Sequence, residues 1–166
     1  RVEMEAISRF ADESGNERYF NLNFNVSPDV DFYLASIVSQ DASIETFIEN
    51  NPYGLKRKDF EDADNPEELL ARLMYEDEWL QTRGSANQTA DMQLLWADTW
   101  FLGTYRIIMY AGDQNFKDYY LTHGSVQDID GNLYQPRFHI EGDGVGVFGS
   151  AVTDTTTITV LANTAF

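Results

Sequence analysis

The sequence has no cysteine and only two histidines, His123 and His139. Without cysteine, the chain forms no disulfide, performs no thiol chemistry and offers no cysteine ligand to a metal. A zinc site would need carboxylates in addition to the two histidines, so no such metal centre is expected. No apolar run approaches the roughly 18 residues that a membrane-spanning helix needs.

Catalytic signatures are also missing from the sequence. It contains no Gly-x-Ser-x-Gly motif, and neither histidine lies in an obvious pairing with a nucleophile. We therefore expect neither enzymatic activity nor a cofactor. With 28 acidic residues, an acid–base pair of the kind found in glycosidases remains open as an alternative.

Basic residues are scarce. There are 11 against 28 acidic residues, which gives a formal net charge of −17, and the only lysines are Lys56, Lys58 and Lys117. Such a surface repels phosphate backbones and anionic lipid headgroups. Binding to nucleic acid or to a membrane surface through charge is therefore not expected.

The chain of 166 residues, of which 43% are hydrophobic, is long enough to bury a core. We expect one β-rich domain over residues 1–166. The chain begins at Arg1 and enters an apparent strand, VEMEAISRF, almost at once. This start is typical of a mature or trimmed piece of a longer precursor.

Strand patterns dominate most of the chain. Phe20, Leu22, Phe24 and Val26 alternate with polar residues, which is the period of a strand with one buried face. Further strands are expected over residues 31–39, 92–100, 103–111, 134–140, 145–152 and 155–161, which are rich in β-branched and aromatic residues.

Helical spacing is confined to the middle of the sequence. Ser43 could cap a short helix through Ile48, and Asn65 followed by Pro66 predicts the start of a helix over 66–81. The segment 56–64 is interpreted as a solvated loop rather than a cation site. We therefore predict a β-rich α+β fold, an antiparallel β-sandwich or partly closed barrel with a helical insertion around residues 43–81.

The stretch EGDGVGVFGS, residues 141–150, resembles a nucleotide-binding loop at first sight. A dinucleotide site needs a helix after the glycines, and a phosphate-binding loop needs a lysine. Here a strand pattern follows, and no lysine occurs after Lys117. The glycines are better explained by a bend or by a close approach of two backbones.

Two further sites are weighed against simpler explanations. Asp128, Asp130 and Asn132 are weak calcium candidates, but the EF-hand spacing fails at both ends and a β-turn is favoured. Trp79, Trp96 and Trp100, together with nearby tyrosines, could form a stacking platform for sugars. Aromatic residues at strand and helix periods belong more often to a core.

Four stretches, taken together, resemble one known family. They are LNFNVSPDVDFYLASI, LLWADTWFLGTYRI, FKDYYLTH and IEGDGVGVFGS. In this order they resemble the C-terminal half of outer-membrane lipoproteins of the Bacteroidota, domain-of-unknown-function family 4249. The matching motif positions are Phe32, Tyr33, Asp98, Phe101, Gly103, Tyr119, Tyr120, Gly142, Gly144, Gly146, Phe148 and Gly149. The family's N-terminal immunoglobulin-like domain and lipid-bearing cysteine lie outside this span.

The resemblance implies a helix at Tyr119 and Tyr120 and a β-fold closed by the glycines, with Phe148 packed into the core. It also implies an exported lipoprotein at the bacterial outer membrane, at the cell surface or facing the periplasm. The expected function is a non-enzymatic accessory or binding subunit of an outer-membrane complex, linked with TonB-dependent transporters. Its partners would be envelope proteins, and its lipid anchor would lie outside this span. The alternative is a carbohydrate-binding module that uses exposed aromatic residues.

Overall fold

The computed structural model describes residues 19–49, 51, 53–82, 89–123, 146 and 148–162. The strands are β1 (Tyr19–Asn25), β2 (Phe32–Ser39), β3 (Tyr75–Gln81), β4 (Thr89–Leu95), β5 (Gly103–Gly112) and β6 (Ala151–Val160). The helices are α1 (Arg57–Glu61), α2 (Pro66–Leu73) and α3 (Gln114–His123), with a single 3₁₀ turn at Trp96–Asp98. The predicted β-rich α+β class is confirmed.

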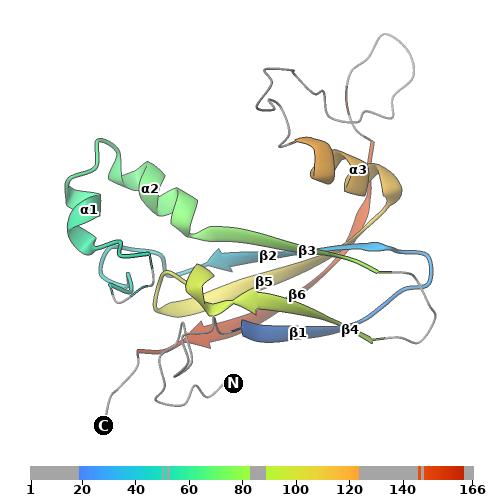
Figure 1. Cartoon of the computed structure of the whole chain (residues 1–166), viewed down its shortest axis with the longest axis horizontal. Helices are drawn as coiled ribbons and strands as arrows, with labels where there is room; N and C mark the ends of the chain where they lie inside the picture. The colour runs from blue at the N-terminus through green and yellow to red at the C-terminus, as the bar shows by residue number, and fades with distance from the viewer. Residues whose placement is uncertain are drawn as a thin grey trace.

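The strands form two antiparallel sheets that face each other (Figure 1). The larger sheet has the order β3-β2-β5-β6, and the smaller one contains β1 and β4. We call the side of the larger sheet that faces β1 and β4 its inner face, and the side under α3 its outer face. The arrangement is sandwich-like, and the described strands form no closed barrel.

The core lies between the two sheets because both contribute alternating apolar side chains. Tyr33, Ala35 and Ile37 of β2 face Met92 and Leu94 of β4, and all five are buried. From β1, the alternating Phe20, Leu22 and Phe24 pack against this cluster. The predicted strand with one buried face is therefore confirmed in β1.

The helical insertion differs from its prediction. Asn65 does cap α2, since its side-chain oxygen accepts a hydrogen bond from the Glu68 N–H at 3.2 Å, and Pro66 is the first helical residue. The predicted helix over 66–81 is wrong beyond Leu73, because residues 75–81 pair with β2 as strand β3. Tertiary pairing thus overrides a helical spacing of Trp79 and Leu80 that arose by coincidence.

Three other predicted elements also need correction. No helix follows Ser43: its backbone N–H and that of Thr46 each donate to the other residue's hydroxyl, which closes a turn. The predicted loop over 56–64 contains α1, whose Phe60 is fully buried. The strand predicted over 92–100 lies instead at residues 89–95 and gives way to the 3₁₀ turn.

At the C-terminal end, one ten-residue strand, β6, replaces the two strands predicted over 145–152 and 155–161. The helix at Tyr119 and Tyr120, which only the family resemblance implied, is present as α3. The strands predicted near the N-terminus and over 134–140 lie outside the described residues.

Asp113 joins the start of α3 to the start of β6. One carboxylate oxygen accepts a hydrogen bond from the Phe116 N–H at 2.8 Å, and the other accepts from both the N–H and the hydroxyl of Ser150. The hydrogen bond from the Phe116 backbone, followed by those from Ser150, lowers the pKa of Asp113. The helix and the edge strand are therefore held at the same corner of the sheet.

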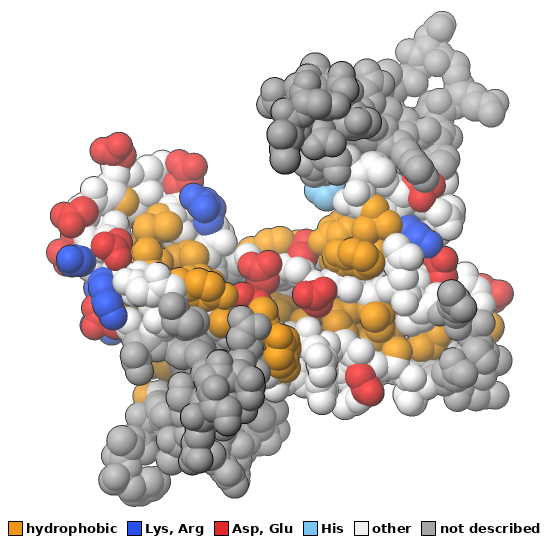
Figure 2. Space-filling view, in the orientation of Figure 1, with side chains coloured by type: hydrophobic (Ala, Val, Ile, Leu, Met, Phe, Trp, Pro, Cys, Tyr) orange, Lys and Arg blue, Asp and Glu red, His pale blue; other side chains and the backbone are white. Residues whose placement is uncertain are grey.

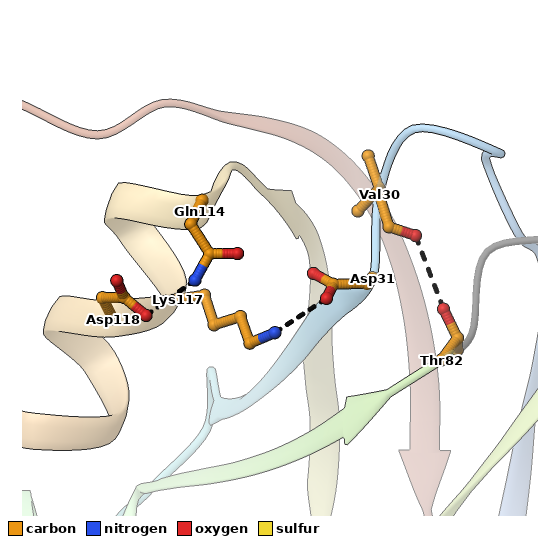
Figure 3. Close-up of polar contacts among 6 residues, drawn as sticks. All are labelled: Val30, Asp31, Thr82, Gln114, Lys117 and Asp118. Atoms are coloured by element: carbon orange, nitrogen blue, oxygen red, sulfur yellow. Dashed lines mark hydrogen bonds and ion pairs between the residues drawn. The ribbon is translucent and has the colours of Figure 1, made fainter.

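A second link fastens α3 to β2. The Lys117 ammonium forms an ion pair with the Asp31 carboxylate at 2.7 Å, just before β2 begins (Figure 3). Gln114 donates to Asp118 along the helix at 2.7 Å. The ion pair and the hydrogen bonds of Asp113 together hold α3 across the outer face of the larger sheet.

Candidate binding surfaces

The first candidate surface is the outer face of the larger sheet beside α3. We call it the aromatic face and define it by Tyr75, Asp77, Trp79, Tyr110 and Tyr120. The first three alternate along β3, while Tyr120 projects from α3. Figure 2 shows a hollow on this side of the molecule, between α2 and α3, with hydrophobic and acidic side chains along its floor.

Buried phenylalanine supports this face from below. Phe32 is fully buried, and its ring centroid lies 6.2 Å from that of Trp79 and 5.7 Å from that of Tyr120. Phe116 of α3 stacks on Tyr110 at 6.2 Å. The aromatic side chains are therefore positioned by a fixed layer rather than by loops.

A hydrogen-bond network joins the polar atoms of the aromatic face. The Ser36 hydroxyl donates to the Asp77 carboxylate at 2.6 Å and lies 3.2 Å from the Tyr75 hydroxyl. The Tyr120 hydroxyl donates to the other Asp77 oxygen at 3.3 Å. One carboxylate thus organises groups from β2, β3 and α3.

The surroundings of the two tyrosines disfavour their phenolate forms. Burial raises the pKa of Tyr75 to about 12, with a further contribution from Asp77. Burial, followed by the charge of Asp77 and its hydrogen bond, also raises the pKa of Tyr120. Both hydroxyls therefore stay protonated and available as hydrogen-bond donors at neutral pH.

This arrangement predicts a loss of stability in alkali. The pKa of Tyr75 is higher in the folded chain than its ordinary value of 10.0. Its protonated form therefore contributes fully to the free energy of unfolding below pH 10, and this contribution is lost as the pH rises toward 12. The melting temperature should fall over that window, and less so in Tyr75→Phe. In Asp77→Asn, phenolate absorbance should show Tyr120 titrating at a lower pH. Titration of Tyr75 at its ordinary pKa of 10.0 would contradict the prediction.

The three tryptophans do not form one platform. Trp96 is buried with its ring 4.5 Å from Phe20, and Trp100 stacks on the buried Phe47 at 6.3 Å. Trp79, by contrast, is 44% exposed. Among the three, only Trp79 presents much of its ring to solvent, and it does so next to Asp77.

The residues singled out by the family resemblance are scattered over the fold. Asp98 lies in the 3₁₀ turn, Gly103 begins β5, and Tyr119 lies on α3, stacked on His123 at 5.2 Å. Phe148 was expected in the core, but it is 83% exposed. That expectation is wrong because residues 148–150 lie against the start of α3, where the Asn115 amide donates a hydrogen bond to the Phe148 carbonyl at 2.8 Å. Of the glycine loop, Gly142 and Gly144 lie outside the described residues, as do the calcium candidates Asp128, Asp130 and Asn132.

The glycines at the end of this loop still show why small residues are needed there. A Cβ on Gly149 would lie 2.8 Å from the Phe116 backbone nitrogen, a distance that real Cβ atoms do not reach. Gly146 is half-buried and precedes β6 outside any strand. A close approach of two backbones, as predicted for this loop, is confirmed at Gly149.

The second candidate surface is a groove between the two sheets, which we call the open groove. Its volume is about 570 Å³. One wall is formed by residues 22–25 of β1 and the other by residues 152–156 of β6. The floor is the inner face of the larger sheet, with Tyr33, Ile107, Met109 and Ala111.

The groove opens because the smaller sheet covers only part of the larger one. Along the inner face of β6, Val160 is 1% exposed, Ile158 is half-buried and Val152 is 77% exposed. Val152 pairs with Ala111 and Asp154 with Met109 across the β5–β6 ladder. An apolar strip of the inner face is therefore left uncovered by the described part of the chain.

Sequence reasoning did not find either surface as a unit. The sequence signal for the aromatic face was the alternation of Tyr75, Asp77 and Trp79, which the helical interpretation of that segment hid. No local sequence pattern predicts the groove, because it results from the smaller sheet having two described strands where the larger one has four. It could be found only after the pairing of all the strands was known.

Within the described ranges, no three histidine or acidic side chains are grouped so that they could hold a metal ion. None of the described helices is long and apolar enough to span a membrane. Comparison of the chain with protein-family models, with curated proteins and with solved structures finds no match in any of the three. The resemblance to the outer-membrane lipoproteins therefore stays a prediction.

Proposed function

We propose that this chain is a non-enzymatic accessory subunit of a bacterial outer-membrane protein complex, of the kind associated with TonB-dependent transporters. The observation that carries the proposal is the open groove, in which an apolar strip of a sandwich core, ending at Val152, reaches solvent. In the part of the chain that the structure describes, this apolar surface lies beside edges of β1 and β6 that no other strand pairs with, and such a surface favours binding to another polypeptide.

Two further features support a protein partner at the envelope. The net charge of −17 disfavours binding to phosphate backbones and anionic lipids. The resemblance of four stretches to outer-membrane lipoproteins supports a location at the outer membrane, with attachment through a lipid anchor outside these residues. The partner is then an outer-membrane or other envelope protein.

The test is affinity purification of the chain from its own membranes in mild detergent, followed by mass spectrometry. We expect stoichiometric recovery of an envelope protein, and at least a tenfold lower recovery with Val152→Lys, which places a charge at the mouth of the groove. Thr159→Lys is the matched control, because Thr159 is exposed on the same strand but does not line the groove. Recovery of the chain alone would contradict the proposal.

The aromatic face favours carbohydrate recognition as a second candidate function. Trp79 offers an exposed ring for stacking on a sugar, and Asp77 lies two residues away on the same face of β3. A carboxylate next to a flat ring is a suitable arrangement for binding a polyhydroxylated ligand, since the carboxylate accepts hydrogen bonds from the sugar hydroxyls.

Substitution of Trp79 tests this candidate directly. If a glycan binds here, a glycan array should give signals that Trp79→Ala abolishes, and binding should quench tryptophan fluorescence in the unmodified chain. Tyr53→Ala is the control, because Tyr53 is also an exposed aromatic residue, at 57%, but lies near Trp100 instead. Array signals that persist in Trp79→Ala would remove the aromatic face as the sugar site.

A further inference from the structure

Within the described residues, the open groove has the width of one further strand between β1 and the inner face of β6. β1 pairs with β4 on one side, and no other described strand pairs with it. Its other side faces the groove, since four consecutive residues, 22–25, line the wall. Successive side chains in a strand point to opposite faces, so a wall of consecutive residues brings the backbone edge itself to the groove.

A strand added beside β1 would bury more apolar surface than one added beside β6. It would extend the smaller sheet across the groove and cover Met109, Ala111 and Val152 on the inner face. A strand added to the outer edge of β6 would instead continue a threonine-rich strand whose residues 151–157 are exposed on both faces. The hydrophobic effect therefore favours the position beside β1.

The groove also specifies the charge of its occupant. Asp154 faces the inner side, opposite Met109, and its carboxylate accepts a hydrogen bond from the neighbouring Thr155 N–H at 2.8 Å. Among the described residues, the one ion pair joins Lys117 to Asp31, so no described lysine or arginine neutralises Asp154. A lysine or arginine from the occupant would do so inside a partly apolar groove, where the pair is less screened than on an open surface.

These features together disfavour a second copy of this chain as the occupant. Each copy carries a net charge of −17, so two copies repel each other, and the chain has only 11 basic residues to offer. A partner with a basic, strand-forming segment could pair with the β1 edge, cover the apolar inner face and neutralise Asp154.

Building on the proposed function, we infer that the open groove binds an extended segment of the partner protein, which pairs with the edge of β1 that no described strand occupies. The segment alternates apolar side chains, which point onto Met109 and Val152, with side chains that face solvent. It carries a lysine or arginine at the position facing Asp154. Backbone hydrogen bonds to β1 provide register, and the alternate side chains provide specificity.

The experiment uses the complex recovered from membranes, with a photo-crosslinking amino acid placed at Asn23 or Asn25. Both residues line the groove, and their exposed side chains lie on the solvent side of β1, within reach of a strand paired beside it. We expect crosslinks from the two positions to fall close together on one partner segment with alternating apolar residues and a basic residue. A crosslinker at Thr159 is the control and should not reach this segment. Hydrogen exchange of the β1 amides should slow at least tenfold in the complex.

A charge reversal tests the basic residue. Asp154→Lys should reduce partner recovery at least tenfold, and a lysine-to-glutamate change in the crosslinked segment should restore it. The inference is overturned if the crosslinks reach a partner surface without an alternating segment, or if they reach other parts of this chain. It is also overturned if β1 amides exchange equally slowly in the free chain. Failure to recover any partner would instead remove the proposed function as well, so the two failures are distinguishable.

Discussion

Replacing Phe47 with alanine is expected to lower the free energy of unfolding by about 3–5 kcal/mol, the usual cost of deleting a buried phenylalanine ring. Phe47 is 2% exposed. Its ring centroid lies 4.9 Å from Phe60 of α1 and 6.0 Å from Phe101, in edge-on contacts, and Trp100 stacks on it. It is a fully packed apolar link between the helical insertion and the sandwich.

The backbone around Phe47 cannot compensate for the lost ring. Hydrogen bonds from the Ile48 N–H to the Trp100 carbonyl and from the Leu102 N–H to the Thr46 carbonyl, at 2.8 and 2.7 Å, hold the two segments side by side. They keep the cavity open, because the segments cannot close over it without breaking them. Amides in α1 should therefore exchange faster in the variant, since Phe60 loses its packing partner.

The measurement is urea unfolding with both the midpoint and the slope reported. Tyr53→Ala is the matched control, since Tyr53 contacts the same Trp100 ring at 5.0 Å but is largely exposed. The Tyr53→Ala substitution should lower the free energy of unfolding by less than about 1 kcal/mol. A similar small loss for Phe47→Ala would mean that the insertion is not anchored by this ring.

The second large effect is expected for Gly103→Ala, at about 2–4 kcal/mol. Gly103 has a φ of +114°, a conformation that residues with a side chain rarely adopt. A Cβ at this position would lie 2.5 Å from Oδ2 of Asp41 and 2.7 Å from its Cβ. The same Asp41 oxygen accepts a hydrogen bond from the Thr104 N–H at 2.6 Å, so the side chain cannot move away without losing it.

A double-mutant cycle separates the two causes. In an Asp41→Gly background, the conformational strain at position 103 remains, while both the carboxylate and the Cβ that an added Cβ would meet are gone, so Gly103→Ala should cost less than in the unmodified chain. Gly54→Ala is the control for strain alone, because Gly54 has a φ of +73° and open space around a Cβ. Its cost should be about 1–2 kcal/mol. Equal costs at the two glycines would show that Asp41 is not an obstacle.

Local chemistry in the sequence was enough to predict some elements but not others. The alternation in β1 and the Asn65–Pro66 helix start were predictable because each depends on neighbouring residues. Strand β3 was not, because residues 75–81 become a strand only by pairing with β2, far away in the sequence. Phe148 was misplaced for a related reason: an apolar residue predicts burial only when its segment joins the core.

The candidate surfaces show the same limit. Trp79 was among the aromatic residues considered, yet its partner Phe32 comes from β2, and Tyr120, which contacts the same Phe32 ring, comes from α3. Similarly, the exposure of Val152 depends on how far β1 reaches across the sheet. Spacing along the chain carries no information about such distances between elements.

The strand order also bears on how quickly the chain folds. Among the described strands, no paired neighbours are joined by a tight turn: β2 reaches β3 only after α1 and α2, and β5 reaches β6 only after α3. β1 and β4 enclose the whole of β2, both helices of the insertion and β3. Each ladder must therefore close a long loop before its hydrogen bonds and packing offset the lost chain entropy. Refolding should be slow for a domain of this size, in the range of milliseconds to seconds or longer, and β5 should spend part of that time with an unpaired edge.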